Sequence, residues 1–450
     1  MYSIKRFKFR NNTEVNDVCL MFDESKPVMY ALLYFSDRLI SKAPTTQYAS
    51  FQAIKLFYQY WQSKFGESFC KSFYQADHNP ELAVIEFGDF YTGLCSRNPN
   101  HFNKYDQMSP QTADIRAKAV IQFLEYLVDK YVSGYYLEET SQSINEQQKY
   151  LFKRLNDNRN SIKNGNKLIS ARPSQYIFKS LTRDMVAAIY RIILPSNLNK
   201  KNDLNPFKRK DIQLRNFLII RLLLNYGLRV GELLLLEKQS LKTNISGSTY
   251  NLIISNLSDS SEDIRRIRPR IKNQFSVRII ELEKIDYEFL MIYLGEIRPK
   301  QSNHQILFSS QNTPYSPLTY ESIRAIFSAV DRAFSVNNPE FKDSNYIDSI
   351  ASLTPHVARH TWATMTLSYL YESIGRNHEA AQKITHSNMN TGRIMDEAKE
   401  QLRTVGGWAL KSTIPDRYAK RFLSEQANRS NVQRIQHDLS CSIELENLES

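Results

Sequence analysis

The sequence is poor in cysteine, glycine and proline, and it has no long apolar run. Its 450 residues contain 4 cysteines, 13 glycines and 15 prolines. The scattered thiols form neither a disulfide framework nor a Cys-x-x-Cys metal motif, and the composition excludes collagen-like and low-complexity chains. The best apolar stretch, 217–224, contains Arg221 and is far shorter than the roughly 20 residues of a membrane span. The basic N-terminus lacks the apolar segment of a signal peptide. We therefore expect a soluble protein of a reducing compartment, with no membrane partner.

Positive charge is in excess and is unevenly distributed. Lys and Arg (59) outnumber Asp and Glu (47), and the net charge of +12 favours a polyanionic partner. Residues 1–140 sum to −1, residues 141–210 to +11 and residues 211–450 to +2. The stretch 141–175 is also rich in Asn, Ser and Gln, which predicts a basic linker. A solvated connector with no binding role is the simpler alternative.

Hydrophobic periodicity predicts helices on both sides of this linker. Within residues 1–140, the windows with helical spacing are 27–41, 48–65, 81–95 and 112–131. Beyond the linker, two short runs, 250–255 and 275–282, have the composition of a β-hairpin or small sheet. The helical windows of this second region are 182–193, 214–226, 230–236, 286–297, 320–333, 356–370, 395–405 and 415–425.

The predicted fold is therefore mainly α, with a helical domain over residues 1–140 and the basic linker over 141–175. A mixed α+β domain with a small β-sheet or hairpin follows over 176–426. The polar residues 427–450, with three glutamates near the end, are predicted to form a C-terminal tail.

Two strings contain arginines that packing alone explains poorly. Gly-Leu-Arg-Val-Gly-Glu-Leu, residues 227–233, puts Arg229 in a glycine-bearing turn before an apolar helix. A snorkelling arginine, or one paired with Glu232, is the alternative. The second string places His356, Arg359 and His360 at i, i+3 and i+4, on one helix face. The arginine disfavours a metal and favours a phosphate, while ordinary surface polarity is the alternative.

Together with Gly-Gly-Trp at 406–408 and a tyrosine shortly beyond, these strings resemble the catalytic domain of the tyrosine recombinases, also called the phage integrase family. The resemblance spans about residues 174–425. Its elements, in the family's order, are a Gly-Leu-Arg-x-x-Glu-Leu string, a lysine of a β-hairpin turn, a His-x-x-Arg-His string, a His or Trp after glycine, and a tyrosine. They fall on Arg229, Lys272, His356 with Arg359 and His360, Trp408 and Tyr418.

The resemblance implies that the chain cleaves and rejoins DNA through a 3′-phosphotyrosyl intermediate, with Tyr418 as nucleophile. Arg229 and Arg359 would hold the non-bridging phosphate oxygens, and Lys272 would protonate the leaving 5′-oxygen. His356 would assist proton transfer at Tyr418. Trp408 would donate its indole N–H to the phosphate or pack against the site, and His360 and Glu232 would support it. Neither a metal nor a cofactor is implied.

The same resemblance implies a helical core-binding domain upstream, for residues 1–140, and double-stranded DNA as the partner. In the predicted linker, the cations expected to contact phosphates are Lys149, Lys153, Arg154 and Arg159. Arg268 and Arg270, close to Lys272, are further candidate phosphate anchors. A tetramer on DNA is expected, with accessory DNA-bending proteins as possible partners and a cytoplasmic, nucleoid-associated location.

The chain departs from the family pattern in two spacings. Ten residues separate Trp408 from Tyr418, one more than is usual, and 48 separate His360 from Trp408, about twice the common gap. The extra segment, 371–393, is interpreted as an insertion that contacts DNA or a partner subunit, or as a plain surface loop.

A type IB topoisomerase and a catalytically inactive DNA-binding regulator are the alternative functions. The sequence names neither the target site nor the outcome of recombination.

Overall fold

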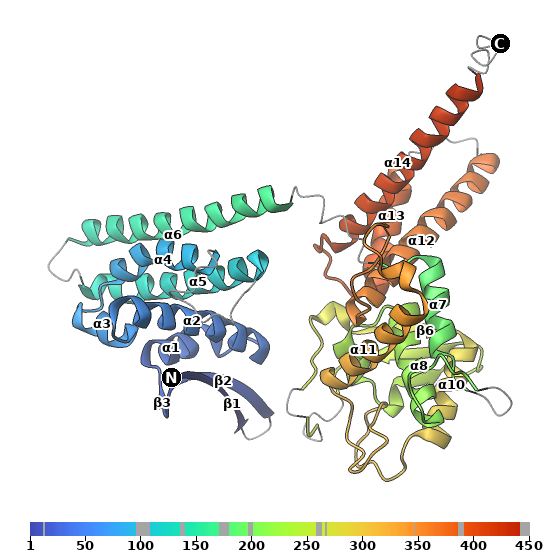
Figure 1. The fold of residues 1–450 in the computed structure, drawn as a ribbon, viewed down its shortest axis with the longest axis horizontal. Helices are drawn as coiled ribbons and strands as arrows, with labels where there is room; N and C mark the ends of the chain where they lie inside the picture. The colour runs from blue at the N-terminus through green and yellow to red at the C-terminus, as the bar shows by residue number, and fades with distance from the viewer. Residues whose placement is uncertain are drawn as a thin grey trace. The chain divides into compact units, whose positions relative to one another are not determined.

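The computed structural model describes the chain except residues 12–13, 96–108, 136–139, 171–179, 197–200, 258–262, 266–267, 347, 386–390 and 442–450. The chain divides into two compact units, Met1–Gln175 and Tyr176–Ser450. Helices dominate both units (Figure 1), so the predicted mainly α fold is confirmed. No helix in the described part is both long and apolar enough to cross a membrane.

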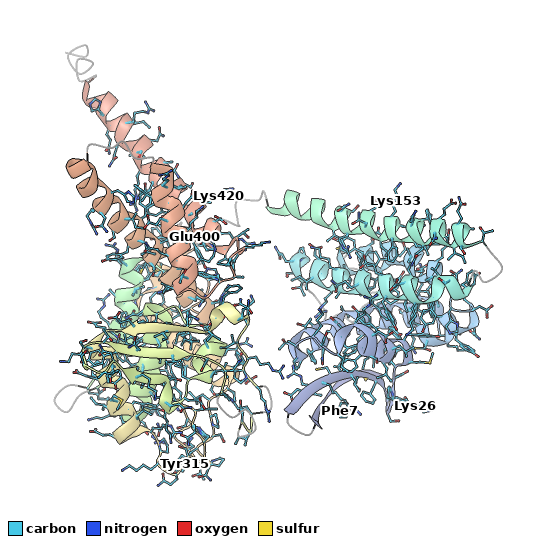
Figure 2. The ribbon with its side chains drawn as sticks, turned by 180° about the vertical axis from the view of Figure 1, so that it is seen from behind. Phe7, Lys26, Lys153, Tyr315, Glu400 and Lys420 are labelled. Carbon is cyan, nitrogen blue, oxygen red and sulfur yellow. The ribbon has the colours of Figure 1, made fainter. Side chains whose placement is uncertain are left out.

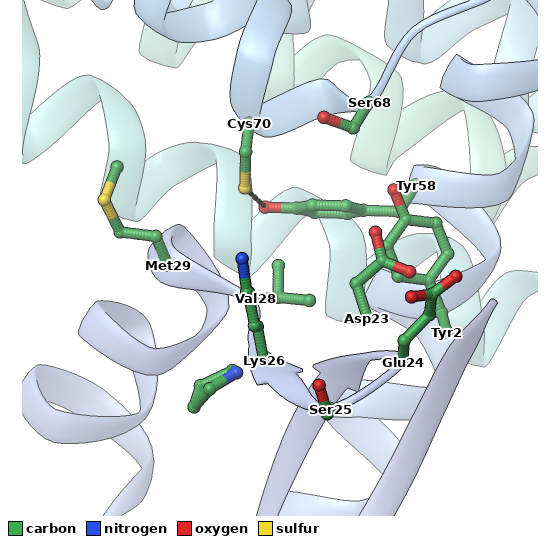
Figure 3. A pocket seen from close by; sticks show the side chains of 11 residues that line it. Tyr2, Asp23, Glu24, Ser25, Lys26, Val28, Met29, Tyr58, Ser68 and Cys70 are labelled. Atoms are coloured by element: carbon green, nitrogen blue, oxygen red, sulfur yellow. Dashed lines mark hydrogen bonds between the residues drawn. The ribbon is translucent and has the colours of Figure 1, made fainter.

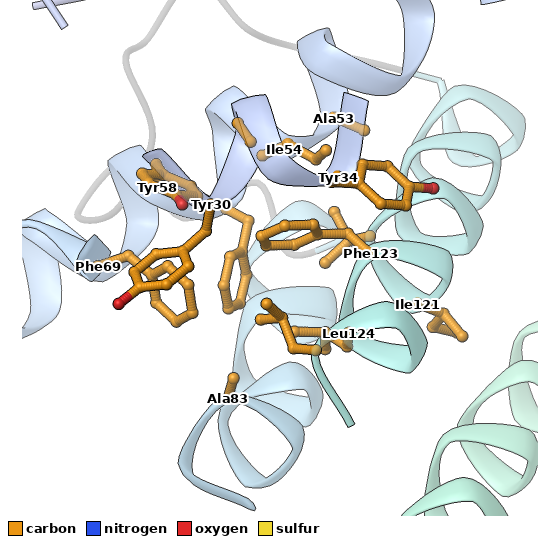
Figure 4. Close-up of a cluster of buried hydrophobic side chains, with 14 of the residues drawn as sticks. Tyr30, Tyr34, Ala53, Ile54, Tyr58, Phe69, Ala83, Ile121, Phe123 and Leu124 are labelled. Atoms are coloured by element: carbon orange, nitrogen blue, oxygen red, sulfur yellow. The ribbon is translucent and has the colours of Figure 1, made fainter. Parts of the chain in front are cut away.

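The first unit packs its helices around an aromatic core. Phe69 is buried there and forms edge-to-face ring pairs with Tyr30, Tyr58 and Phe123 (Figure 4). Such pairs add to the free energy gained by burying the rings. The helices are α1 (Met29–Tyr34) with the π-helical η1 (Phe35–Leu39), α2 (Pro44–Phe65), α3 (Phe69–Gln75), α4 (Pro80–Cys95), α5 (Pro110–Tyr135) and α6 (Ser141–Ser170). All four helical windows predicted for this region are observed, whereas α3 was not predicted.

A β-hairpin, also not predicted, precedes these helices. Strand β1 (Tyr2–Asn11) pairs antiparallel with β2 (Glu14–Asp23), and β3 (Lys26–Pro27) extends the sheet. Tyr2, Cys19 and Met21 are buried in the core of the unit, so the hairpin is part of the domain. Beside it lies a pocket of about 460 Å³, in whose wall the Tyr58 hydroxyl is 3.6 Å from the Cys70 sulfur (Figure 3).

Helix α6 corrects the prediction of a linker over residues 141–175. Ser141–Ser170 form one helix, and Leu151, Leu155 and Ile162 on it are buried in the core of the first unit. These sparse apolar residues lie on one helix face, and the surrounding Asn, Gln and Lys residues obscure them in the composition. The segment is thus part of the first unit and not a solvated connector; residues 171–175 lie outside the described part.

The second unit combines a small sheet with helices. In the sheet, β5 pairs antiparallel with both β4 and β6, from Tyr250 opposite Leu282 to Ile254 opposite Arg278 along β6. The predicted strands correspond to β5 and β6, and β4 was not predicted. The elements are α7 (Arg183–Ile193), α8 (Lys210–Asn225), α9 (Val230–Leu235), η3 (Lys238–Ser240), β4 (Leu241–Thr243), β5 (Tyr250–Ile254), η5 (Gln274–Ser276), β6 (Arg278–Leu282), α10 (Lys284–Ile292), η6 (Tyr293–Ile297), α11 (Tyr320–Asn337) and η7 (Pro339–Lys342).

Three helices complete the second unit: α12 (Pro355–Thr385), α13 (Thr391–Val405) and α14 (Ile414–Cys441). They share a separate hydrophobic cluster that includes Trp362, Leu402, Trp408 and Phe422. The predicted insertion at 371–393 is not a surface loop where it is described, because α12 continues to Thr385 and α13 begins at Thr391; residues 386–390 lie outside the described part. The predicted tail from 427 is likewise helical as far as Cys441, since α14 continues through it, and residues 442–450 are not described.

Candidate active site

Glu232 is the anionic centre of the candidate site. It is the third residue of α9, and its side chain is 1 % exposed. The carboxylate accepts a hydrogen bond from Arg278 at 3.0 Å and another from the Arg229 side chain, and Nη1 of Arg359 lies 3.9 Å from it. Burial alone would raise the pKa of Glu232, but the three arginines lower it below its usual value. One buried carboxylate thus holds three guanidinium groups together.

Arg229 is fixed by the turn that begins α9. It is the residue that precedes the first helical turn, and its backbone N–H donates to Oε2 of Glu232 at 2.9 Å. Its Nη1 donates to Oγ of Ser276 and its Nη2 to the carbonyl oxygen of Gly407, each at 2.9 Å. The Glu232-paired arginine considered above is therefore observed. These bonds use only part of the five N–H donors of the guanidinium.

Arg359 lies deeper, on α12. Its Nη2 donates to the carbonyl oxygen of Gly406 at 2.6 Å and its Nη1 to that of Gly227. The guanidinium carbon is 4.8 Å from the centre of the Trp408 ring, within cation–π range. Burial and the positive charge of Arg229 lower the pKa of Arg359 to about 9, so the group stays charged at neutral pH. A buried cation beside another cation favours an anionic ligand.

Two glycines allow the backbone to approach these arginines. Gly227 and Gly407 both have φ of +60°, a region that side-chain-bearing residues rarely adopt. A Cβ at Gly227 would lie 2.1 Å from the Trp362 ring, and one at Gly407 would lie 2.7 Å from Nη1 of Arg278. The glycines that flank the motifs thus serve close packing at the site.

His360 contacts the candidate nucleophile. Its Nδ1 lies 2.6 Å from the Tyr418 hydroxyl, and its Nε2 lies 2.8 Å from Nε2 of His356. The two histidines share one face of α12, as their spacing predicts, and Tyr418 reaches them from α14. The family resemblance implies that His356 assists at Tyr418, whereas in the structure His360 lies between the two.

Tyr418 and Trp408 border the arginines. Trp408 is buried, and its ring centre is 6.2 Å from that of Tyr418. Burial raises the pKa of the Tyr418 hydroxyl above its usual value, although the charges of Arg359 and Arg417 act in the opposite direction. The hydroxyl is therefore protonated at neutral pH and needs a proton acceptor before it can attack.

Lys272 is not brought into contact with these groups. It is exposed and forms no hydrogen bond or ion pair with any residue of the described part. Its loop does approach α9, because a Cβ at Gly231 would lie 3.3 Å from the Arg270 carbonyl oxygen. Of the neighbouring candidate phosphate anchors, Arg270 is exposed, whereas Arg268 is half-buried.

Two residues that organise the site were not predicted from the sequence. Arg278, at the start of β6, donates to the carbonyl oxygens of Val405 and Ser276, each at 2.8 Å, besides Glu232. The Ser276 hydroxyl contacts Arg229. Both residues lie within six positions of Lys272, in a segment from which only Arg268, Arg270 and Lys272 were predicted as site residues.

The cations predicted to contact phosphates in the first unit differ in their surroundings. Lys149 and Lys153 are exposed, one turn apart on α6, and Figure 2 labels Lys153 on that helix. Arg159 is half-buried and forms an ion pair with Glu125 at 2.8 Å. Nη1 of Arg154 lies 3.4 Å from the Tyr150 hydroxyl. The two lysines are thus better available to a polyanion than Arg159.

Chemically, the site combines a hydroxyl nucleophile, an adjacent imidazole and clustered guanidinium groups. This set suits attack on a phosphodiester, whose charge increases at the non-bridging oxygens in the transition state. Within the described ranges, no group of three or more His, Cys, Asp or Glu side chains is placed to hold a metal ion.

Comparison with known proteins agrees with this chemistry. The model of the phage integrase family matches residues 197–395, which include Arg229, His356, Arg359 and His360. No curated protein matches the chain.

Several solved structures align with low scores. One is the XerA recombinase, with 15% identity over 78% of this chain and 98% of that chain and a TM-score of 0.32. Another is the XerH site-specific recombinase bound to its difH substrate, with 15% identity over 78% of each chain and a TM-score of 0.34. A third is the Tn1549 transposon integrase in complex with transposon right-end DNA, with 14% identity over 73% of this chain and 94% of that chain and a TM-score of 0.34. Alignments at this level add no argument to the family match. On that match, residues 197–395 form a domain of the phage integrase family, the family of the tyrosine site-specific recombinases.

Proposed function

We propose that the chain is a site-specific recombinase that cleaves and rejoins double-stranded DNA, with Tyr418 as the nucleophile. The observation that carries this proposal is that Arg359 and Tyr418 both lie near Trp408, while Arg229 binds the carbonyl oxygen of the preceding Gly407, in a unit that contains the family domain. A hydroxyl beside clustered cations suits attack on a phosphate. The protein would work where the DNA is, in the cytoplasm at the nucleoid.

Arg229 and Arg359 hold the non-bridging oxygens as charge accumulates there. By analogy with a lost oxyanion-hole donor, each arginine contributes about 3 kcal/mol to transition-state stabilisation. Tyr418 forms the 3′-phosphotyrosyl bond, and Lys272 donates a proton to the leaving 5′-oxygen. The contact between Ser276 and Arg229 supports this role, because Ser276 lies only four residues from Lys272.

Exchange between two duplexes breaks four strands. Since each chain supplies one tyrosine nucleophile, four copies are required, and we propose a tetramer on DNA. The exposed Lys149 and Lys153 and the Lys272 loop with Arg270 contact the phosphate backbone, which adds affinity without sequence selectivity. Accessory DNA-bending proteins are the further partners that this function allows.

Trapping the covalent intermediate tests the proposal. A binding duplex is first selected from a random-sequence pool with Tyr418→Phe protein, then nicked beside the scissile phosphate so that the cleaved fragment diffuses away. Wild-type protein and the matched control Tyr369→Phe, whose ring is 65% exposed, should form a denaturation-resistant adduct, and Tyr418→Phe should form none. An adduct with Tyr418→Phe would assign the nucleophile elsewhere.

The same assay separates the alternative functions. Relaxation of supercoiled plasmids that lack the selected sequence, without strand exchange between sites, would identify a type IB topoisomerase. Binding of the selected duplex without any adduct would identify a DNA-binding regulator.

A further inference from the structure

The contacts of His360 define a continuous path for a proton away from Tyr418. The Tyr418 hydroxyl lies 2.6 Å from Nδ1 of His360, and Nε2 of the same ring lies 2.8 Å from Nε2 of His356. A neutral imidazole has one donor and one acceptor nitrogen. If Nδ1 accepts the tyrosyl O–H, Nε2 of His360 must donate to His356, whose own proton then resides on Nδ1.

We propose that His360 is the base that takes the proton of Tyr418 and that His356 receives it next. This inference rests on the proposed function and assigns the base of its cleavage step. As the bond between the Tyr418 oxygen and phosphorus forms and the bond from phosphorus to the 5′-oxygen breaks, the tyrosyl proton moves to Nδ1 of His360. The Nε2 proton of His360 moves to Nε2 of His356, and the leaving 5′-oxygen takes a proton from Lys272. Religation reverses each transfer.

The surroundings of Tyr418, His360 and His356 favour proton transfer away from the tyrosine. His356 is exposed whereas His360 and Tyr418 are half-buried, so the proton moves from the interior toward solvent. Arg359 on α12 and Arg417 on α14 place positive charge near the tyrosine oxygen, which stabilises the oxyanion that is left. The buried Trp408 ring also packs near the tyrosine, with its centre 6.2 Å from that of Tyr418.

The first test compares rates of adduct formation at saturating concentrations of the selected, nicked duplex. His360→Asn keeps a hydrogen-bond acceptor but cannot take a proton at neutral pH, so its rate should fall about 100-fold, a typical contribution of a general base. The rate of His356→Asn should fall by a smaller factor, because His360 can still accept the proton. His378→Asn, a matched change on the same helix, should react like wild type. Thermal unfolding and duplex binding identify any variant that is misfolded.

A second readout distinguishes proton transfer from packing. In His360→Ala, added imidazole should restore part of the rate, and a series of substituted imidazoles should restore more as their basicity rises. A purely structural histidine would show no such dependence, and that result would overturn the proposal.

A third readout locates the proton at the nucleophile and not at the leaving group. In a duplex whose bridging 5′-oxygen is replaced by sulfur, the leaving group needs no proton. The rate of adduct formation by Lys272→Ala should therefore return to near the wild-type rate, whereas that of His360→Asn should stay low. Restoration of the His360→Asn rate by the sulfur substrate would overturn the inference, as would a His360→Asn variant that reacts within twofold of wild type on the normal duplex. If wild-type protein itself forms no adduct, the proposed function fails and the relay fails with it.

Discussion

Nη2 of Arg278 lies 3.0 Å from Oε2 of Glu232, and both side chains are almost fully buried. The pair connects three segments that are distant in sequence, because Arg278 begins β6, Glu232 belongs to α9, and Nε of Arg278 donates to the carbonyl oxygen of Val405 at the end of α13. Glu232 in turn binds Arg229. The position of that catalytic candidate therefore depends on a residue outside the recognised motifs.

Replacing this carboxylate should destabilise the second unit in a pH-dependent way. Glu232→Gln leaves buried guanidinium groups without their counter-charge, and we expect a loss of about 3 kcal/mol in unfolding free energy at pH 7. The folded-state pKa of Glu232 is lowered, so its stabilising contribution is complete above the unfolded-state pKa of about 4.3 and decreases as pH falls through the folded-state value. The difference between wild type and variant should therefore shrink below about pH 4.

The difference in unfolding free energy between wild type and Glu232→Gln can be measured by urea unfolding in a Trp61→Phe background. The remaining tryptophans, Trp362 and Trp408, both lie in the second unit, so fluorescence then reports on that unit alone. A difference that stays constant down to pH 3 would show that the charge of Glu232 does not stabilise the fold.

Gly407→Ala should damage the site more than an equivalent change elsewhere. Its φ of +60° strains any side-chain-bearing residue, and its Cβ would also lie 3.1 Å from the Ser276 Cα and close to Arg278. Gly247 has a similar φ of +68° with open space around it, so Gly247→Ala measures backbone strain alone, about 1 kcal/mol. We expect Gly407→Ala to lose more stability in the same fluorescence assay and to slow adduct formation. Equal losses would mean that crowding at Gly407 is unimportant.

Residues whose chemistry and spacing form a motif could be placed from the sequence. Arg229, Arg359 and Tyr418 are examples, since their order along the chain resembles the family motif and the structure places them in one site. The partners of these residues could not be predicted, because they depend on tertiary packing. Arg278 reaches the carbonyl oxygen of Val405 across 127 positions of sequence, and the contact of His360 with Tyr418 requires α12 and α14 to pack together.

Composition was misleading where apolar residues are few. In α6, three fully buried apolar residues are spread along a helix of 30 residues. The composition of any short window of this helix is therefore dominated by the Asn, Gln and Lys residues between them. The N-terminal hairpin was overlooked for a related reason, because the basic residues of β1 were considered only as a targeting segment and not as an alternating strand.

The packing of α6 predicts that Leu155→Ala destabilises the first unit. Leu155 is fully buried, and removing a buried leucine side chain typically costs about 2–5 kcal/mol. Hydrogen exchange of peptides from α5 and α6 should accelerate accordingly. Asn156→Ala, a change at the adjacent exposed position, serves as the control. If both variants exchange like wild type, α6 does not stabilise the unit and the connector interpretation would be restored.

The salt dependence of DNA binding should distinguish the cations of α6. Because Lys149 and Lys153 are exposed, neutralising both by alanine should weaken binding to every duplex and reduce the slope of log affinity against log salt by about 2. Arg159→Ala should instead lower the stability of the first unit, because Arg159 is already paired with Glu125, and should leave the slope nearly unchanged. Lys42→Ala, at an exposed position outside α6, is the matched control for loss of one charge. An unchanged slope in the double variant would show that α6 stabilises the unit without contacting phosphates.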